Sequence, residues 1–171
     1  SSFAVTTMSW WLPTAIWCTG CSPLPTATSV EPYLSRLDGD AFATLNAAFL
    51  LDGSFIRIPD GVSVDRPIHL LYLAHGDSLV QQPRSIIVAG RGSSVTIVES
   101  YVGPNAAGSF TNAVTEILMG DDATVDHVRI QEESLTGFHI GAVMAQQGRN
   151  SRYTSTSVSL GAALARNNLV T

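Results

Sequence analysis

The chain of 171 residues is long enough for one domain or part of one, and with 45% hydrophobic and 13% charged residues it can bury a sizeable core. The formal net charge of −5 argues against a nucleic-acid partner, which calls for a basic surface. A membrane-spanning helix needs about 20 predominantly apolar residues in a row. No such run occurs, so we expect no membrane partner.

Residues 1–30 differ in composition from the rest of the chain. They contain no charged side chain, yet they hold all three tryptophans and both cysteines, Cys18 and Cys21. A secretory signal would begin with a positive segment, which is absent, and Pro13 interrupts the apolar run. We predict that residues 1–30 are an uncharged leader, either disordered or foreign to the natural domain.

Residues 31–53 form a predicted helical segment that leads into the core. Three apolar residues recur there at the three-and-four spacing of one helix face: Phe42, Leu45 and Phe49. Asp38 or Asp40 can cap the start of this helix, and Gly53 follows where it would end. We expect the helix to lie on the end of the following domain and to cover unpaired strand edges there.

Residues 54–171 carry runs rich in β-branched and aromatic residues, several of them alternating apolar with polar at period two. The clearest runs are residues 85–88, 95–98, 113–117, 124–130 and 153–160. This pattern is typical of strands, and glycines between the runs mark turns. Helical repeats would instead show Leu and Ala at three-and-four spacing.

These strands recur at a regular interval. Gly92, Gly120 and Gly148 are 28 residues apart, Phe110 matches Phe138 at the same spacing, and Gly61 begins an imperfect copy 31 residues before Gly92. A fixed period of this size is typical of a solenoid, whose units bury their apolar faces against their neighbours. We predict an all-β fold, a right-handed parallel β-helix of about 28 residues per coil over residues 54–171.

The chain stops at Thr171, within a predicted strand. We therefore expect a truncated protein with an incomplete β-helix. Its open terminal coil would be able to self-associate, because unpaired strand edges recruit other chains.

Several segments resemble a known family, in the family's order and at its spacing: residues 45–61 (LNAAFLLDGSFIRIPDG), 67–71 (PIHLL), 83–84 (PR), 99–103 (ESYVG), 110–116 (FTNAVTE), 151–155 (SRYTS) and 161–167 (GAALARN). They are similar to the SufB/SufD family, scaffold proteins of bacterial iron–sulfur cluster assembly, and the last segments are closer to SufD. The resemblance covers about residues 31–171 and leaves residues 1–30 unexplained.

The resemblance implies a cytoplasmic, SufD-like scaffold subunit of the SUF machinery, working with a SufB-like scaffold and a SufC-like ATPase. It implies that the chain is not an enzyme, since ATP hydrolysis would belong to the SufC-like partner. The family's cluster-related cysteine and histidine, and its SufC-contacting segment, would lie beyond Thr171. No residue here therefore inherits a catalytic, cofactor-binding or metal-binding role, and the iron–sulfur cluster is implied only for the full complex.

Cysteine and histidine are the side chains best suited to bind a metal in this sequence. Cys18 and Cys21 form a CxxC pair, a pattern found in zinc sites and in redox pairs. A structural zinc site normally takes four ligands, and the sequence has no second cysteine pair, so we expect no functional role for this one. His69 and His75 fall in the irregular first coil, and we expect no role for either.

In a 28-residue register, Glu99, His127 and Ser155 share one column, so Glu99 and His127 could lie side by side. Such a pair is either a fragment of a metal site or a polar ladder on a solvated or subunit-facing sheet. His139 would lie beside Thr111 without a carboxylate neighbour in its column. We therefore expect His139 to be structural.

An acidic cluster supports an alternative function: Asp121, Asp122, Asp126, Glu132 and Glu133. Some β-helix enzymes hold calcium with aligned carboxylates while a basic residue abstracts a proton from a polysaccharide. A secreted polysaccharide lyase is thus one alternative, although the chain has no Lys to serve as base and turn aspartates are ordinary. A structural or adhesive β-solenoid is the other alternative.

Overall fold

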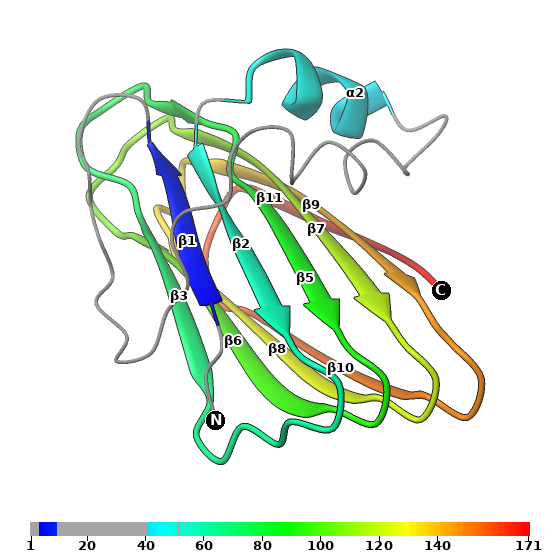
Figure 1. The fold of residues 1–171 in the computed structure, drawn as a ribbon. Coiled ribbons are helices and arrows are strands. Elements are labelled where there is room, and N and C mark those ends of the chain that lie inside the picture. The colour runs from blue at the N-terminus through cyan, green and yellow to red at the C-terminus, as the bar shows by residue number, and fades with distance from the viewer. Residues whose placement is uncertain (1–3, 10–40, 51) are drawn as a thin grey trace.

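The computed structural model describes residues 4–9, 41–50 and 52–171, and Figure 1 shows their arrangement. Within this part of the chain the elements are β1 (Ala4–Ser9), α2 (Ala41–Ala48), β2 (Asp52–Ile58), β3 (Ile68–Leu73), β4 (Val80–Gln81), β5 (Arg84–Ala89), β6 (Ser94–Gly103), β7 (Phe110–Met119), β8 (Thr124–Glu133), β9 (Phe138–Gln146), β10 (Arg152–Ser159) and β11 (Leu164–Val170).

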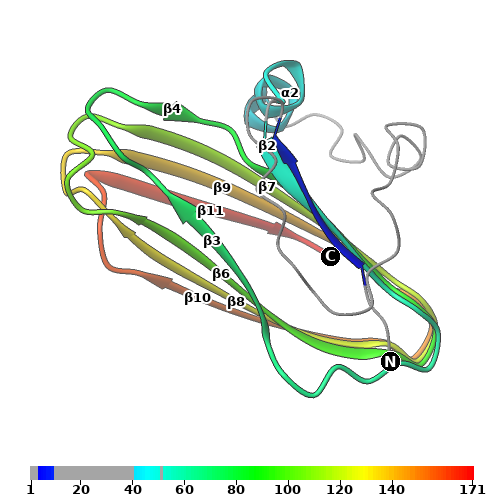
Figure 2. The ribbon, with the colours of Figure 1, turned by 60° about the vertical axis from the view of Figure 1, so that its left-hand side comes forward.

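The described strands build two sheets that face each other (Figure 2). Sheet A has the order β1-β2-β5-β7-β9-β11, with the short β4 beside β7, and sheet B has the order β10-β8-β6-β3. Every pairing is parallel except β1 with β2. The chain alternates between the sheets from β5 onward, so the predicted parallel β-solenoid is confirmed.

The coils differ in length, so the predicted fixed period is wrong in detail. Successive paired residues lie 31, 30, 28 and 26 positions apart: Gly53 with Arg84, Ser94 with Thr124, Phe110 with Phe138, and Phe138 with Leu164. The match of Phe110 with Phe138 is confirmed. The predicted match of Gly92 with Gly120 fails, because β6 and β8 are offset by 30 residues rather than 28.

The turns that lead from sheet A to sheet B show why the match of Gly92 with Gly120 fails. One stacked turn position has a left-handed backbone in every coil, with φ of 68° at Gly61, 62° at Gly92, 58° at Asp122 and 56° at Asn150. Backbone hydrogen bonds join these turns from coil to coil, as from Gly92 N to the oxygen of Asp121 (2.8 Å). Besides Gly, Asn and Asp tolerate this conformation best, so the column keeps its geometry while its residue type changes.

Gly120 and Gly148 belong to a neighbouring column that begins at Gly90. A Cβ atom on Gly148 would lie 2.6 Å from the carbonyl carbon of Gly120. One on Gly120 would lie 3.1 Å from the carbonyl carbon of Gly90. These glycines are required because one coil's backbone presses on the next, not because the turn needs a positive φ.

The interior between the two sheets has an apolar part and a polar part. The apolar cluster includes Ile56, Ile87, Ile97, Ile117 and Val125, all fully buried, and it runs from coil to coil near the glycine turns. Side chains alternate between inward and outward along each strand, so every second residue points into the interior. On β6 and β8 the inward positions that follow the apolar cluster carry polar side chains, which form the site described below.

Helix α2 lies on the outer face of sheet A and not on the end of the solenoid, which corrects the prediction. Ala43 packs against Val114 of β7 and Ala142 of β9. The predicted apolar stripe is also not the buried face, because Leu45 is 37% and Phe49 57% exposed. The predicted caps, Asp38 and Asp40, lie outside the described residues.

A buried polar clasp holds the helix in place. Asn46 Nδ2 donates to the backbone oxygens of Asn112 (2.9 Å) and Pro83 (3.1 Å). Arg84 donates to Asn46 Oδ1 (3.1 Å) and forms an ion pair with Glu116. Because helix and sheet meet through hydrogen bonds to fixed carbonyl groups, a small polar residue serves better at this face than a large apolar one.

Gly53 does not end the helix but lies in β2. A Cβ atom there would collide with the backbone oxygen of Arg84 on β5. Within the predicted leader, the structure describes residues 4–9 as β1, which pairs antiparallel with β2 at the edge of sheet A. The rest of the leader, including Cys18 and Cys21, lies outside the described residues.

Replacing Gly148 with Ala is expected to destabilise the fold by about 3 kcal/mol, because the added methyl group must push two coils apart. Gly61→Ala is the comparison: it adds left-handed turn strain of about 1 kcal/mol, which Gly148→Ala does not, but nothing lies within 4 Å of the added atom. Urea unfolding of the variants and the wild type measures both losses. Equal losses would contradict the conclusion that coil spacing sets the requirement for Gly148.

Candidate functional site

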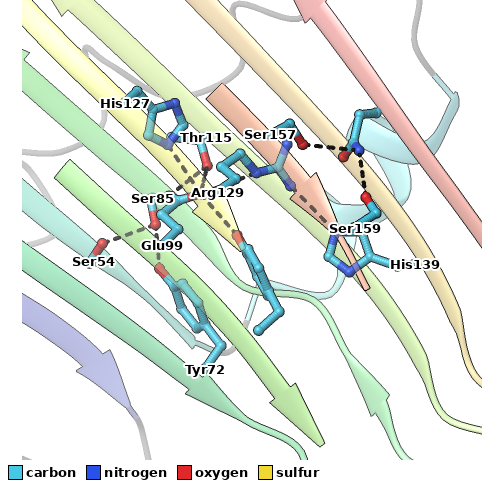
Figure 3. A network of polar contacts seen from close by, with 12 residues as sticks. Ser54, Tyr72, Ser85, Glu99, Thr115, His127, Arg129, His139, Ser157 and Ser159 are labelled. Carbon is cyan, nitrogen blue, oxygen red and sulfur yellow. Dashed lines mark hydrogen bonds and ion pairs between the residues drawn. The ribbon is translucent and has the colours of Figure 1, made fainter. Parts of the chain in front are cut away.

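The polar part of the interior is the most unusual feature of the described chain, because charged side chains are rarely buried between two sheets. We call it the luminal network; it consists of Glu99 and Tyr101 (β6), Thr111 and Thr115 (β7), His127, Arg129, Gln131 and Glu133 (β8), and His139 (β9). All of these residues are buried. Figure 3 shows how several of them converge between the two sheets.

Glu99 is the centre of the first half of the network, and its side chain is fully buried. Its carboxylate accepts hydrogen bonds from Thr115 Oγ1 (2.9 Å to Oε1) and from the Tyr101 hydroxyl (3.2 Å to Oε2). His127 Nε2 and Arg129 Nε each lie 3.4 Å from Glu99 Oε2. Neither nitrogen has hydrogen-bond geometry to a partner among the described residues, so their attraction to Glu99 is chiefly electrostatic.

This environment holds Glu99 in its charged form. Burial alone would raise its pKa, but the charges of His127 and Arg129 and the hydrogen bond from Thr115 lower the pKa from 4.5 to about 2. The neighbouring phenol shifts the other way: burial and the charge of Glu99 raise the pKa of Tyr101 well above its usual value. Glu99 is therefore an ion and Tyr101 a neutral hydrogen-bond donor.

Glu133 and His139 form the second half of the network. His139 Nδ1 lies 2.7 Å from Glu133 Oε2, and the same carboxylate accepts hydrogen bonds from Thr111 and from Gln131 Nε2 (3.0 Å). Burial raises the pKa of Glu133, but the hydrogen bond and charge of a protonated His139, with the hydrogen bonds from Thr111 and Gln131, outweigh it and the net pKa is lowered. Arg129 joins the halves, since its Nη2 lies 3.4 Å from His139 Nε2.

Aromatic rings and one glycine shape the space around Arg129. The Tyr101 ring stacks on Tyr72 with centroids 4.9 Å apart, and the Arg129 guanidinium lies 5.6 Å from the Tyr101 centroid. Gly141 leaves the room that the guanidinium occupies, because a Cβ atom there would collide with Arg129 Nη2. Tyr72 in turn hydrogen-bonds Ser85, which accepts from Ser54, so polar contacts reach the first coil.

The sequence predicted that Glu99 and His127 lie side by side, and they do, but for a different reason. Glu99 pairs in register with Arg129, and His127 pairs with Ile97. Only the match of His127 with Ser155 is as predicted. The pair is also not on a solvated or subunit-facing sheet, since both side chains point into the lumen and are fully buried.

His139 does lie beside Thr111, as predicted, but the expectation that it lacks a carboxylate neighbour is wrong. Glu133 reaches it from the opposite sheet, and a register within one sheet cannot reveal such a contact. Arg129 and Gln131 were missed altogether. Both lie an even number of residues after the core residue Val125 on β8 and therefore on the same inward face. The period-two alternation of β8 was thus the signal that could have identified them.

The acidic cluster does not converge on a calcium site. Asp126 and Glu132 are exposed, whereas Glu133 is buried in the lumen. Asp121 pairs with Arg149 (3.3 Å) in a solvated turn, and Asp122 occupies the left-handed turn position. Among the described residues, no group of three or more His, Cys, Asp or Glu side chains could hold a metal ion together.

The remaining histidines lie away from the network. His69 is exposed on β3, where its Nε2 contacts Ser100 Oγ (2.8 Å), and His75 is exposed in the loop after β3. No helix in the described part of the chain has the length and apolar character to cross a membrane.

Comparison with known proteins gives the family. A family model described as "SUF system FeS cluster assembly, SufBD core domain" matches residues 72–171, which include β6 to β11 and the whole luminal network. The chain belongs to the SufBD family. This confirms the resemblance noted in the sequence.

Curated relatives agree with this membership. The chain is 37% identical over 172 residues to an iron–sulfur cluster assembly SufBD family protein of Synechocystis, covering 92% of this chain and 38% of that protein. It is 30% identical to the chloroplastic protein ABCI7 of Arabidopsis thaliana, covering 92% of this chain and 36% of that protein. A SufBD family protein of Staphylococcus epidermidis matches 53% of the chain at 36% identity and is covered over 20% of its length. The chain thus spans less than two fifths of these relatives.

Replacing Glu99 with Gln is expected to lower the stability at pH 7 by about 3 kcal/mol, because it leaves the buried Arg129 guanidinium without its counter-charge. The folded pKa of Glu99, about 2, lies below the ordinary value of 4.5. Its contribution is therefore complete above about pH 4.5 and is lost as the pH falls toward 2. Glu99→Gln should remove that part of the acid dependence, leaving a smaller part from Glu133.

Urea unfolding between pH 7 and pH 2.5 measures this dependence. Asp126→Asn is the matched control, because Asp126 is an exposed carboxylate on β8 and its replacement should leave the profile unchanged. The same acid slope in wild type and Glu99→Gln would contradict the prediction.

Proposed function

We propose that the protein is a SufD-like scaffold subunit of the SUF machinery, which supports iron–sulfur cluster assembly with SufB-like and SufC-like partners and does not itself catalyse a reaction. The observation that carries the proposal is the family match over residues 72–171. The proposal includes a cytoplasmic location. The names of the Synechocystis and Staphylococcus relatives, which describe iron–sulfur cluster assembly, support a role in that process.

The geometry supports a scaffold rather than a polysaccharide lyase. A lyase needs carboxylates and a base on one accessible surface. Here the exposed acidic residues are spread over turns and strand faces, and the two carboxylates of the luminal network, Glu99 and Glu133, are buried. A long polysaccharide cannot reach them without unfolding the coils.

The luminal network also suits a scaffold physically. Its hydrogen bonds and ion pairs connect β6, β7, β8 and β9, which belong to different sheets, and so they oppose sliding of one coil over another. A buried polar network specifies one arrangement, because any shift leaves a charge without its partner. A rigid stack of this kind holds its outer surfaces in fixed positions for partner subunits.

Co-expression with the SufB-like and SufC-like subunits of a bacterial SUF system tests the proposal. A tagged copy of the protein is expected to retain the SufB-like subunit through affinity and size-exclusion steps, and the SufC-like subunit through that complex. A tagged β-helix polysaccharide lyase is the matched control and should retain neither. Failure to retain a SufB-like subunit, together with calcium-dependent release of unsaturated sugar from polygalacturonate, would favour the lyase and reject the scaffold.

The 171-residue chain alone is expected to bind no stoichiometric iron–sulfur cluster. A cluster takes about four soft, deprotonated ligands, and the chain's only thiols are Cys18 and Cys21. His127 and His139 are already engaged by Glu99 and Glu133 inside the lumen. Anaerobic reconstitution with iron and sulfide should therefore give no stoichiometric charge-transfer absorption. A stable cluster that disappears in the Cys18→Ser/Cys21→Ser variant would contradict this expectation.

A further inference from the structure

We propose that His139 is a neutral histidine with its proton on Nδ1, and that it serves as a proton-sensitive latch between the two sheets. It lies on β9 of sheet A, and both of its ring nitrogens face side chains of β8 in sheet B. The proposal does not depend on the proposed function, because it concerns only contacts inside the solenoid.

The contacts of the two ring nitrogens fix the tautomer. Arg129 Nη2 lies 3.4 Å from His139 Nε2 with hydrogen-bond geometry, and a guanidinium can only donate. Nε2 must therefore accept, which leaves the ring proton on Nδ1. That proton points to Glu133 Oε2 at 2.7 Å, a carboxylate whose lowered pKa keeps it ionised. The hydrogen bonds thus run in one direction, from Arg129 through His139 to Glu133.

The groups that face His139 leave little alternative to this arrangement. Arg129 and Glu133 approach it from β8, and the Tyr101 ring from β6 meets it edge-on with centroids 4.9 Å apart. Its register neighbours in sheet A, Thr111 and Ala165, do not titrate. His139 is only 1% exposed, so solvent cannot replace either partner.

A second proton on His139 would have to sit on Nε2, directly against Arg129. Two cations 3.4 Å apart in a buried site repel each other strongly, and Arg129 would have to withdraw. Arg129 also faces Glu99 at 3.4 Å, so its withdrawal would remove the guanidinium charge that stabilises that carboxylate. Protonation on sheet A would in this way loosen contacts within sheet B.

His127 provides an internal comparison. Its Nε2 faces the Glu99 carboxylate, and its Nδ1 lies 3.0 Å from the Tyr153 hydroxyl, which can either donate or accept. No cation lies against either of its nitrogens in these contacts, so a second proton on this ring breaks none of them. The two buried histidines therefore respond differently to acid, and only His139 acts as a latch.

Imidazole groups ordinarily change charge between pH 5 and 8, so the latch can be tested in that range. Long-range ¹⁵N–¹H correlation spectra of the wild-type chain at pH 7.5 are expected to show His139 with a protonated Nδ1 and an unprotonated Nε2. On lowering the pH to 5.5, the opening equilibrium of buried amides in β8 and β9, measured by hydrogen exchange corrected for intrinsic rates, should rise about tenfold. A proton on Nε2 at pH 7.5, or an opening equilibrium that does not change with pH, would overturn the proposal.

Two variants separate the latch from general acid sensitivity. His139→Asn keeps a side-chain donor for Glu133 but takes up no second proton, so its opening equilibrium should be the same at pH 7.5 and 5.5. His127→Gln should keep the tenfold rise of the wild type. Loss of the rise in His127→Gln but not in His139→Asn would assign the latch to the wrong histidine and reject the proposal. If His139→Asn does not fold, the tautomer and exchange data of the wild type still decide it.

Discussion

The structure depends on the stacking of coils of unequal length at a shared turn. Each described coil passes from sheet A to sheet B through a left-handed position filled by Gly61, Gly92, Asp122 or Asn150, and the backbones on either side hydrogen-bond to the coil above. Because this position is fixed, the residues that follow it enter sheet B in register. Part of the difference in coil length is absorbed at the opposite end, where the loops vary and β4 adds a short extra pairing to β7. In the first coil two residues are absorbed soon after the turn, since Ser63 pairs with Ser94 but Ile68 pairs with Ile97.

Fixed register in turn allows charges to be buried. An ion taken out of water costs several kcal/mol unless a partner is held at the right place. Glu99 meets Arg129 because their strands pair in register, and it meets Thr115 because the facing sheet is held by the same turns. The Arg84–Glu116 pair under helix α2 follows the same rule on the outer face of sheet A. Rigid stacking and buried polar contacts therefore support each other.

The sequence was sufficient for the fold class but not for the register. Period-two alternation and the spacing of glycines predicted parallel strands, and the match of Phe110 with Phe138 was correct. Aligning Gly92 with Gly120 by residue type put β6 and β8 two residues out of register, since the true equivalents of Gly92 are Asp122 and Asn150. The position of helix α2 could not be predicted from its apolar stripe, because Asn46 docks it through backbone carbonyl groups of distant strands.

Only part of the luminal network could be predicted from the sequence. A shift of two residues keeps the parity of a strand, so even the wrong register put Glu99 and His127 on the same face. Their burial, and the contact of His139 with Glu133, required the second sheet, which supplies its partners across the lumen and not along the ladder. In a solenoid the sequence repeat predicts which residues are neighbours within one sheet. It does not predict which side chains of the two sheets meet in the interior. Arg129 contacts ionisable groups on both sheets, Glu99 on β6 and His139 on β9, and its position depends on the missing side chain of Gly141.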